Sequence, residues 1–335
     1  MKTMSPSRSF SADILKLDPH EEAQRITGSI RELAIERLHR KGVVVGLSGG
    51  IDSSVVASLC VRALGKERVV GLFMPEADSS DDSLRLGQLI ADSLGIKTTI
   101  TEDISPILEA AGCYKRRDDA IRTVVPHYSK SYKSKIVLPS ILSGNGYRIF
   151  SVVVQAPDGV QTKARLTAEA YLGLVAATSF KQRVRKMMEY YHADRLQYAV
   201  AGTPNRLEYD QGFFVKNGDE AADLKPIAHL YKTQVYQLAD YLKVPEEIQR
   251  RQPTTDTYSL QQSQEEFYFS VPYDKMDLCL YGKNHSVSPS DVAQAVGLTP
   301  EQVEKVYRDI DAKRLATRYL HMKALLVQQV KEIAL

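Results

Sequence analysis

The stretch Val43-Val44-Val45-Gly46-Leu47-Ser48-Gly49-Gly50-Ile51-Asp52-Ser53-Ser54 decides the fold. After its glycines, apolar residues recur at the spacing of a buried helix face: Val55, Val56, Leu59, Cys60, Ala63 and Leu64. A strand that turns through glycines into a helix makes a phosphate cradle, because the backbone can approach the anion and the helix N–H groups point at it. We expect Ser48, Gly49, Gly50 and Ser53 to hold phosphate groups, and Asp52 to bind a divalent cation bridging them.

No Gly-Lys-Ser or Gly-Lys-Thr follows the glycines, so the loop is not of the Walker type. The pattern Ser-Gly-Gly-x-Asp-Ser instead resembles the pyrophosphate loop (PP-loop) of the ATP pyrophosphatases. Those enzymes cleave ATP between the α and β phosphates and transfer AMP to a substrate oxygen. The alternative is a glycine turn in which Asp52 only complements the dipole at a helix N-terminus.

The composition is that of an ordinary globular protein of 335 residues, with 43% hydrophobic and 25% charged residues. A net charge of +3 is too small to argue for a nucleic-acid partner. The three cysteines are far apart and form no Cys-x-x-Cys motif, and no apolar run approaches the length of a membrane span. We therefore expect a cytoplasmic protein that binds neither a membrane nor nucleic acid.

Strand-like and helix-like segments alternate along most of the chain. Buried strands are predicted near residues 43–46, 69–74, 96–101 and 196–201, with amphipathic helices between them, including one over 21–41. This alternation predicts an α/β fold, a doubly wound parallel sheet with helices on both faces. In such a sheet ligands bind at the carboxyl ends of the strands, where the phosphate loop lies.

We expect a flexible tail over residues 1–20 and then a single domain over 21–335. Residues 113–166 differ in texture, because basic and aromatic residues are mixed there and 136–142, 147–156 and 160–166 have the pattern of short strands around the turn Pro157-Asp158-Gly159. We interpret this segment as a small β insertion, either a hairpin lid over the site or a surface or subunit contact. Residues 286–335 are predicted to form a helical C-terminal extension.

Five further motifs follow the phosphate loop in order: Lys-Gln-Arg-Val-Arg-Lys-Met at 181–187, Gly-Thr-Pro-Asn-Arg-Leu-Glu at 202–208, Gly-Asp-Glu-Ala-Ala-Asp at 218–223, Leu-Tyr-Lys at 230–232 and Pro-Thr-Thr at 253–255. This succession resembles the ammonia-dependent NAD synthetases, the amide-forming branch of the ATP pyrophosphatases, which have the adenine nucleotide alpha hydrolase-like fold. The resemblance implies that the nicotinate carboxylate of deamido-NAD is adenylated, that pyrophosphate leaves, and that ammonia then displaces AMP to give NAD.

The resemblance also implies roles for individual residues. Asp52 and Glu208 would bind Mg²⁺, and Lys232 and Thr254 would contact the phosphates in catalysis. Arg183 and Thr203 would face ATP. The deamido-NAD side would be contacted by Arg185, Tyr190, Lys216, Asp219 and Asp223. Because Arg183 and Arg185 are two apart on a helix, they cannot share a face, so one of them can be a plain surface charge.

Three departures concern the substrate side more than the ATP side: Ser179 where the family usually has Asn, the insertion, and Gln-Glu-Glu-Phe at 264–267 where Asp-Glu is usual. The same chemistry on another carboxylate is therefore an alternative, and an ATP-binding regulatory module without turnover is another. Such a module would be expected to lose its metal carboxylates, whereas Asp52 and Glu208 are both present. About forty residues precede the first strand, too few for a glutaminase domain, so ammonia would come from solution or from a separate amidotransferase. The resemblance further implies a homodimer.

Overall fold

The structure, a computed structural model, describes residues 10–138, 150–254, 257–263, 268–269, 271–328 and 330. At its centre is a parallel sheet of four strands in the order β3 (Thr98–Thr101), β2 (Val69–Phe73), β1 (Val43–Gly46) and β7 (Ala199–Ala201). The chain builds outward from β1 to β3 and then places β7 on the other side of β1. This reversal confirms the doubly wound fold and opens a crevice where β1 and β7 end.

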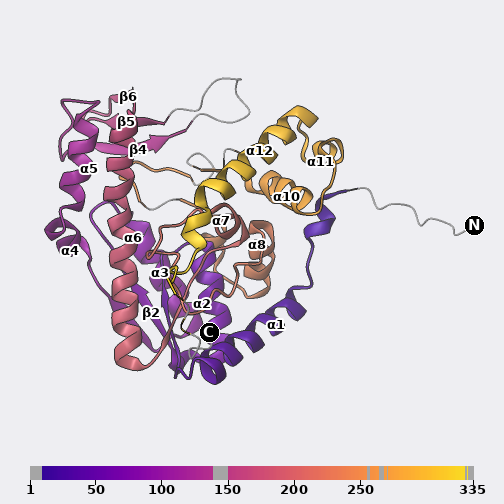
Figure 1. Ribbon diagram of the computed structural model, residues 1–335. Helices are drawn as coiled ribbons and strands as arrows, with labels where there is room; N and C mark the ends of the chain where they lie inside the picture. Colours follow the sequence, from indigo (N-terminus) through magenta and orange to yellow (C-terminus); the bar gives the residue numbers. More distant parts are fainter. Residues whose placement is uncertain are drawn as a thin grey trace, which may run out of the picture.

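Helices cover both faces of the sheet (Figure 1). Along β1, Val43 and Val45 pack on one side with α1, α2, α3 and α8, whereas Val44 packs on the other side with α6. A strand buried on both faces requires such a run of β-branched residues. The helices that complete the two layers are α1 (Pro19–Arg31), α2 (Ile51–Leu64), α3 (Asp81–Leu94), α4 (Ser105–Ala110), α6 (Ala168–Leu196), α7 (Arg206–Gln211), α8 (Lys232–Tyr241) and α9 (Glu246–Arg250).

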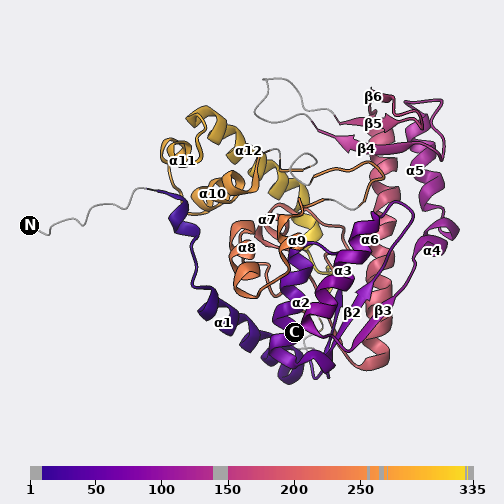
Figure 2. The same cartoon turned by 180° about the vertical axis from the view of Figure 1, so that it is seen from behind.

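A second, antiparallel sheet of β4 (Lys133–Val137), β5 (Ser151–Gln155) and β6 (Gln161–Arg165) lies at the N-terminal end of α6 (Figure 2). Its inner face packs against α5 (Cys113–Arg122) and the first turns of α6. Strands β5 and β6 lie within the predicted ranges 147–156 and 160–166, whereas β4 begins three residues before the predicted range 136–142 and ends at Val137. Residues 139–149 lie outside the described residues. The segment is not purely β, however. Its basic and aromatic start is helix α5, which buries Tyr114 and Arg117.

The C-terminal part contains α10 (Tyr273–Asn284), α11 (Pro289–Val296) and α12 (Pro300–Thr317), so the predicted helical character is present. These helices share an apolar core in which Met276, Val292 and Ile310 are buried. Figure 1 shows them beside α7 and α8, on the opposite side of the molecule from the small sheet.

The predicted N-terminal tail is wrong for its second half. Residues 1–9 lie outside the described residues, but Leu15 is buried and the backbone N–H of Leu17 donates to Gln237 Oε1 at 3.1 Å. Helix α1 then begins at Pro19 and continues as the π-helical turn Glu32–Arg37. An apolar anchor within a polar stretch therefore attaches this segment to the domain.

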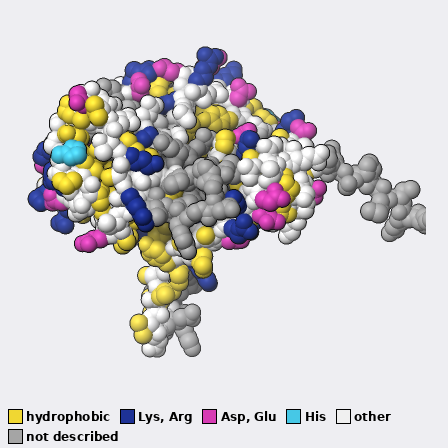
Figure 3. Space-filling view, turned by 90° about the horizontal axis from the view of Figure 1, so that it is seen from above, with side chains coloured by type: hydrophobic (Ala, Val, Ile, Leu, Met, Phe, Trp, Pro, Cys, Tyr) yellow, Lys and Arg dark blue, Asp and Glu magenta, His cyan; other side chains and the backbone are white. Residues whose placement is uncertain are grey.

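Within the described residues, no helix combines the length and apolar character that a bilayer crossing requires. On the face of the molecule seen in Figure 3, basic side chains are scattered and acidic ones lie among them.

Candidate active site

A cavity of about 240 Å³ opens at the carboxyl ends of β1, β2 and β7. Its floor is formed by the strand ends and the phosphate loop, and one wall by α6. The other walls are the loop after β2 and the residues around Thr254. Of the predicted site residues, the cavity brings together Ser48, Gly50, Asp52, Ser53, Arg185, Thr203, Glu208, Asp219 and Thr254.

The phosphate loop is held in shape by its own contacts. Gly49 has φ +70°, and a Cβ there would lie 2.7 Å from both Leu86 Cβ and Ser83 O of α3, so both the backbone conformation and the close packing require glycine. Ser48 Oγ lies 3.2 Å from Ser53 Oγ, and the Ser53 hydroxyl donates to Gly50 O at 3.0 Å. The N-terminus of α2 is thus presented to the cavity, with hydroxyl groups at its edge.

A buried charge cluster lies beside this loop. The Lys232 ammonium is fully buried and forms an ion pair with Asp52, which also accepts a hydrogen bond from Asn205 Nδ2 at 3.2 Å. Burial lowers the pKa of Lys232, but the charges of Asp52 and Glu208 more than compensate, so the net pKa is raised. Burial and the Asp52 charge together raise the pKa of Glu208 to about 8.

The donor set of Asp52 and Glu208 fits a hard divalent cation. The Asp52 charge raises the pKa of Glu208 and the Lys232 charge lowers it, so the two carboxylates and the ammonium interact at one place. Carboxylate oxygens are ligands that Mg²⁺ prefers. In the described ranges no group of three or more His, Cys, Asp or Glu side chains is arranged to hold a metal. Such an ion would therefore need further oxygens, which phosphates and water supply in many Mg²⁺ sites.

Asp277 of α10 positions Lys232, and the sequence analysis missed it. Its carboxylate accepts hydrogen bonds from the backbone N–H groups of Lys232 at 3.2 Å and Thr233 at 2.7 Å, where α8 begins. Burial raises the pKa of Asp277 to about 7. No local motif marks this residue, because its role depends on the packing of α10 against α8.

Helix α6 contributes more to the cavity than was expected. Besides Arg185, it places Gln182, Lys186 and Glu189 in the wall. The Lys186 ammonium is within 2.6 Å of Glu189 Oε2, and a Cβ on Gly46 would lie 2.9 Å from Glu189 Oε1. The spacing 182, 185, 186 and 189 places these residues on one helix face, and this periodicity was the signal that could have identified them.

Six predicted residues lie outside the cavity lining: Gly49 and Lys232, already described, and Arg183, Lys216, Tyr190 and Asp223. Arg183 is exposed and its Nε donates to Lys216 O at 3.3 Å, which confirms that Arg183 and Arg185 face different ways. The Lys216 ammonium donates to carbonyl oxygens of Tyr319 and Met322, at 3.0 and 2.7 Å.

The other two residues outside the lining, Asp223 and Tyr190, contact each other. Asp223 accepts from Val200 N at 2.7 Å and from the Tyr190 hydroxyl at 3.3 Å. It thereby fixes the backbone of β7. By contrast Asp219, whose pKa burial raises to about 6, lines the cavity and accepts from Val215 N at 2.7 Å.

Comparison with known proteins gives consistent results. A family profile described as NAD synthase matches residues 22–127 and 149–317. The NH(3)-dependent NAD(+) synthetase of Rhizobium meliloti (strain 1021) is 60% identical over 324 residues, which is 97% of this chain and 96% of that protein.

Two solved structures have the same fold. The NMN synthetase of Francisella tularensis aligns with a TM-score of 0.65 at 23% identity, covering 93% of this chain and 99% of that one. The NH3-dependent NAD synthetase of Campylobacter jejuni aligns with a TM-score of 0.60 at 22% identity, covering 93% and 100%.

Proposed function

The chain belongs to the NAD synthase family, and from that premise we propose that it joins ammonia to the nicotinate carboxylate of deamido-NAD, with cleavage of ATP to AMP and pyrophosphate. The observation that carries this proposal is the cavity at the switch point of the sheet, where the phosphate loop meets the Asp52–Lys232 pair and Glu208. An ATP pyrophosphatase needs hydrogen-bond donors that face the phosphates, and charged groups that can bind a cation and a phosphate side by side. Both kinds of group are present in this cavity region.

The first step forms the acyl-adenylate. A carboxylate oxygen of the nicotinate attacks the α-phosphorus, the bond to the bridging oxygen breaks, and pyrophosphate leaves. The N–H groups at the start of α2, with the Ser48 and Ser53 hydroxyls, stabilise the leaving pyrophosphate. Lys232 and Thr254 contribute positive charge and a donor from the opposite side, and Arg183 and Thr203 are assigned to ATP.

We assign Mg²⁺ to Asp52 and Glu208. When bound, such an ion neutralises phosphate charge and polarises the phosphoryl oxygens. The contribution of the protein itself is a change of ion-pair partner at Lys232. Asp52 pairs with Lys232 in this structure, so metal binding at Asp52 would free the Lys232 ammonium for a phosphate oxygen.

In the second step ammonia attacks the carbonyl carbon of the mixed anhydride, AMP leaves, and the nitrogen loses a proton to give the neutral amide. The substrate side is assigned to Arg185 and Asp219 in the cavity. Tyr190, Lys216 and Asp223 also belong to this assignment and would need to act from outside the lining.

The test is formation of NAD, AMP and pyrophosphate from ATP, Mg²⁺ and ammonium, with deamido-NAD compared against nicotinate mononucleotide and a panel of small carboxylic acids. Preference for deamido-NAD supports the proposal. Preference for another acid, at equal ATP consumption, would support the adenylation chemistry but identify a different carboxylate substrate.

We further propose a homodimer in a reducing cytoplasm. Exposed apolar side chains such as Leu315, Leu325 and Leu326 are the support for self-association, because isolated chains seldom expose several in one segment. All three cysteines are buried free thiols, as a reducing compartment allows. Light scattering of the purified protein tests the first of these statements.

A further inference from the structure

Lys181 of α6 is fully buried, and its ammonium group uses all three of its protons. It donates to Glu76 Oε1 at 2.8 Å, to Asp78 Oδ2 at 2.6 Å and to the backbone carbonyl of Thr257 at 2.8 Å. Burying a charged group costs several kcal/mol unless its partners are complete. The complete set here means that the three segments are held in one relative position.

Two of these segments are walls of the nucleotide cavity. Glu76 and Asp78 lie in the loop after β2, in which the flanking Pro75, Ser79 and Ser80 line the cavity. Thr257 is three residues beyond Thr254, which lines the facing wall. Lys181 therefore joins the two walls from behind, one residue before Gln182 on the wall formed by α6.

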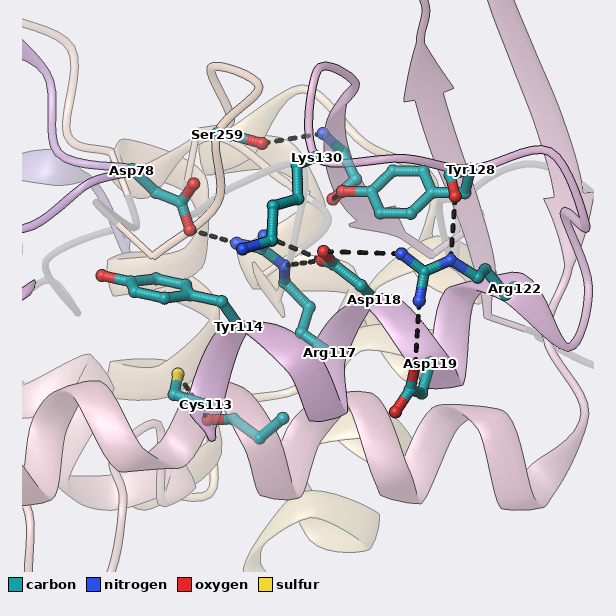
Figure 4. Close-up of polar contacts among 12 residues, drawn as sticks. Asp78, Cys113, Tyr114, Arg117, Asp118, Asp119, Arg122, Tyr128, Lys130 and Ser259 are labelled. Carbon is teal, nitrogen blue, oxygen red and sulfur yellow. Dashed lines mark hydrogen bonds and ion pairs between the residues drawn. The ribbon is translucent and has the colours of Figure 1, made fainter. Parts of the chain in front are cut away.

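Helix α5 braces the same group. The Arg117 guanidinium lies between Asp78 and Asp118 and pairs with both (Figure 4). The Tyr114 hydroxyl donates to Glu76 Oε2 at 2.8 Å. Each carboxylate that Lys181 contacts is thus also held by a side chain of α5, so the position of the loop after β2 depends on this helix.

The small sheet holds the second wall. At the edge of β4, Ser134 N donates to Ser259 Oγ at 2.9 Å and Leu260 N donates to Ser134 O at 3.2 Å. The Gln262 amide donates to Ile136 O. The segment that follows Thr257 is therefore held along the edge of β4 by these three hydrogen bonds, one of which is between backbone groups.

We propose that Lys181 is a positioning residue for ATP, fixing the distance between the loop after β2 and the wall around Thr254, with α5 and β4 as its support. This inference rests on the proposed use of the cavity for ATP. It assigns to α5 and β4, within the segment 113–166, a role in shaping the nucleotide site from behind. Small displacements of binding groups weaken a site strongly, so the effect should appear in ATP affinity.

The test is Lys181→Met, which keeps an unbranched side chain as far as Cε and removes the ammonium group with its three hydrogen bonds. We expect the KM for ATP, and the Kd of Mg²⁺–ATP measured by calorimetry, to rise about tenfold, with the KM for ammonia unchanged. The matched control is His192→Met on the same helix. His192 is buried and lies 3.0 Å from Glu102 Oε1, and neither residue lines the cavity.

A merely structural role would lower the folded fraction, and hence kcat, in both variants without moving either KM. That result would overturn the proposal. If Lys181→Met does not fold, Tyr114→Phe removes the hydrogen bond to Glu76 and a longer one from Ala77 N at 3.4 Å, and should raise the KM for ATP about threefold. An unchanged KM in that variant would equally overturn it. Calorimetry distinguishes a failure of this inference from a failure of the proposed function, because ATP affinity can be measured even if deamido-NAD is not the substrate.

Discussion

The Lys232 ammonium is paired with the Asp52 carboxylate, which joins the first residue of α8 to the first turn of α2. Lys232 is fully buried, whereas 16% of the Asp52 side chain is exposed, toward the cavity. The pair therefore has one partner fixed in the interior and one that a ligand can reach. An ion pair with this arrangement can stabilise the fold through Lys232 and contact a ligand through Asp52.

Lys232→Met should destabilise the protein and abolish adenylation. Removing one partner of a buried ion pair leaves an uncompensated charge, which costs about 3 kcal/mol. Thermal melting measures this loss. The double variant Lys232→Met with Asp52→Asn should melt higher than Lys232→Met alone, since it no longer buries an unpaired carboxylate. Equal melting temperatures would show that the pair is not coupled.

Asp52→Asn and Glu208→Gln should each reduce pyrophosphate release by about a hundredfold or more, because loss of a metal ligand removes several kcal/mol of transition-state stabilisation. Both replacements keep the shape of the side chain. Circular dichroism and melting serve as the control for folding. Near-normal turnover in either variant would remove that residue from the metal site.

The affinity for Mg²⁺ in the presence of nucleotide should increase with pH up to about 8 and then level off. The pKa of Glu208 is raised to about 8, so the group is protonated at neutral pH and must lose that proton to bind a cation. One proton displaced corresponds to about a tenfold change in affinity per pH unit below the pKa.

The control for this pH dependence is Glu208→Gln, which reports the contribution of the nucleotide alone. The unsubstituted protein and Glu208→Gln are titrated with Mg²⁺ at pH 6.5, 7.5 and 8.5. The Mg²⁺ affinity of the unsubstituted protein should change with pH more steeply than that of the variant, and the two should change equally only near the highest pH. Parallel curves throughout would show that Glu208 does not exchange a proton for the metal.

The purified chain should use ammonium as its nitrogen donor and should not respond to glutamine. Among the residues that the structure describes, no cysteine lines the cavity, and Cys60, Cys113 and Cys279 are all buried. NAD formation with each donor, in a preparation freed of other proteins, is the measurement. Comparable rates with glutamine alone would contradict the expectation.

The doubly wound parallel sheet and the phosphate loop could be predicted because both depend on local pattern. The β-branched run at Val43–Gly46 and the glycines after it carry the information within a dozen residues. Arg185, Thr203, Glu208 and Thr254 were located in the same way, by motif order. Their roles in binding stay predictions.

The buried contacts could not be predicted, because they join residues far apart in the chain. Lys181 was quoted only as the first residue of a motif, and neither Glu76 nor Asp78 stood in any motif, although the three meet behind the cavity. Similarly, Leu196 has the apolar character of a strand but is the last residue of α6, since the preceding helix continues to it. Tertiary packing decided both cases.

The edges of the small sheet also matter for how the protein avoids aggregation through strand pairing. An open strand edge is a template for pairing with another chain, and β4 would present one if residues 259–262 were absent. The opposite edge, β6, carries the exposed charges of Lys163 and Arg165, which disfavour such pairing. The segment along β4 thus protects the protein against aggregation. Shortening it in an engineered variant would expose unpaired backbone N–H and C=O groups of β4 and would also disturb the nucleotide site.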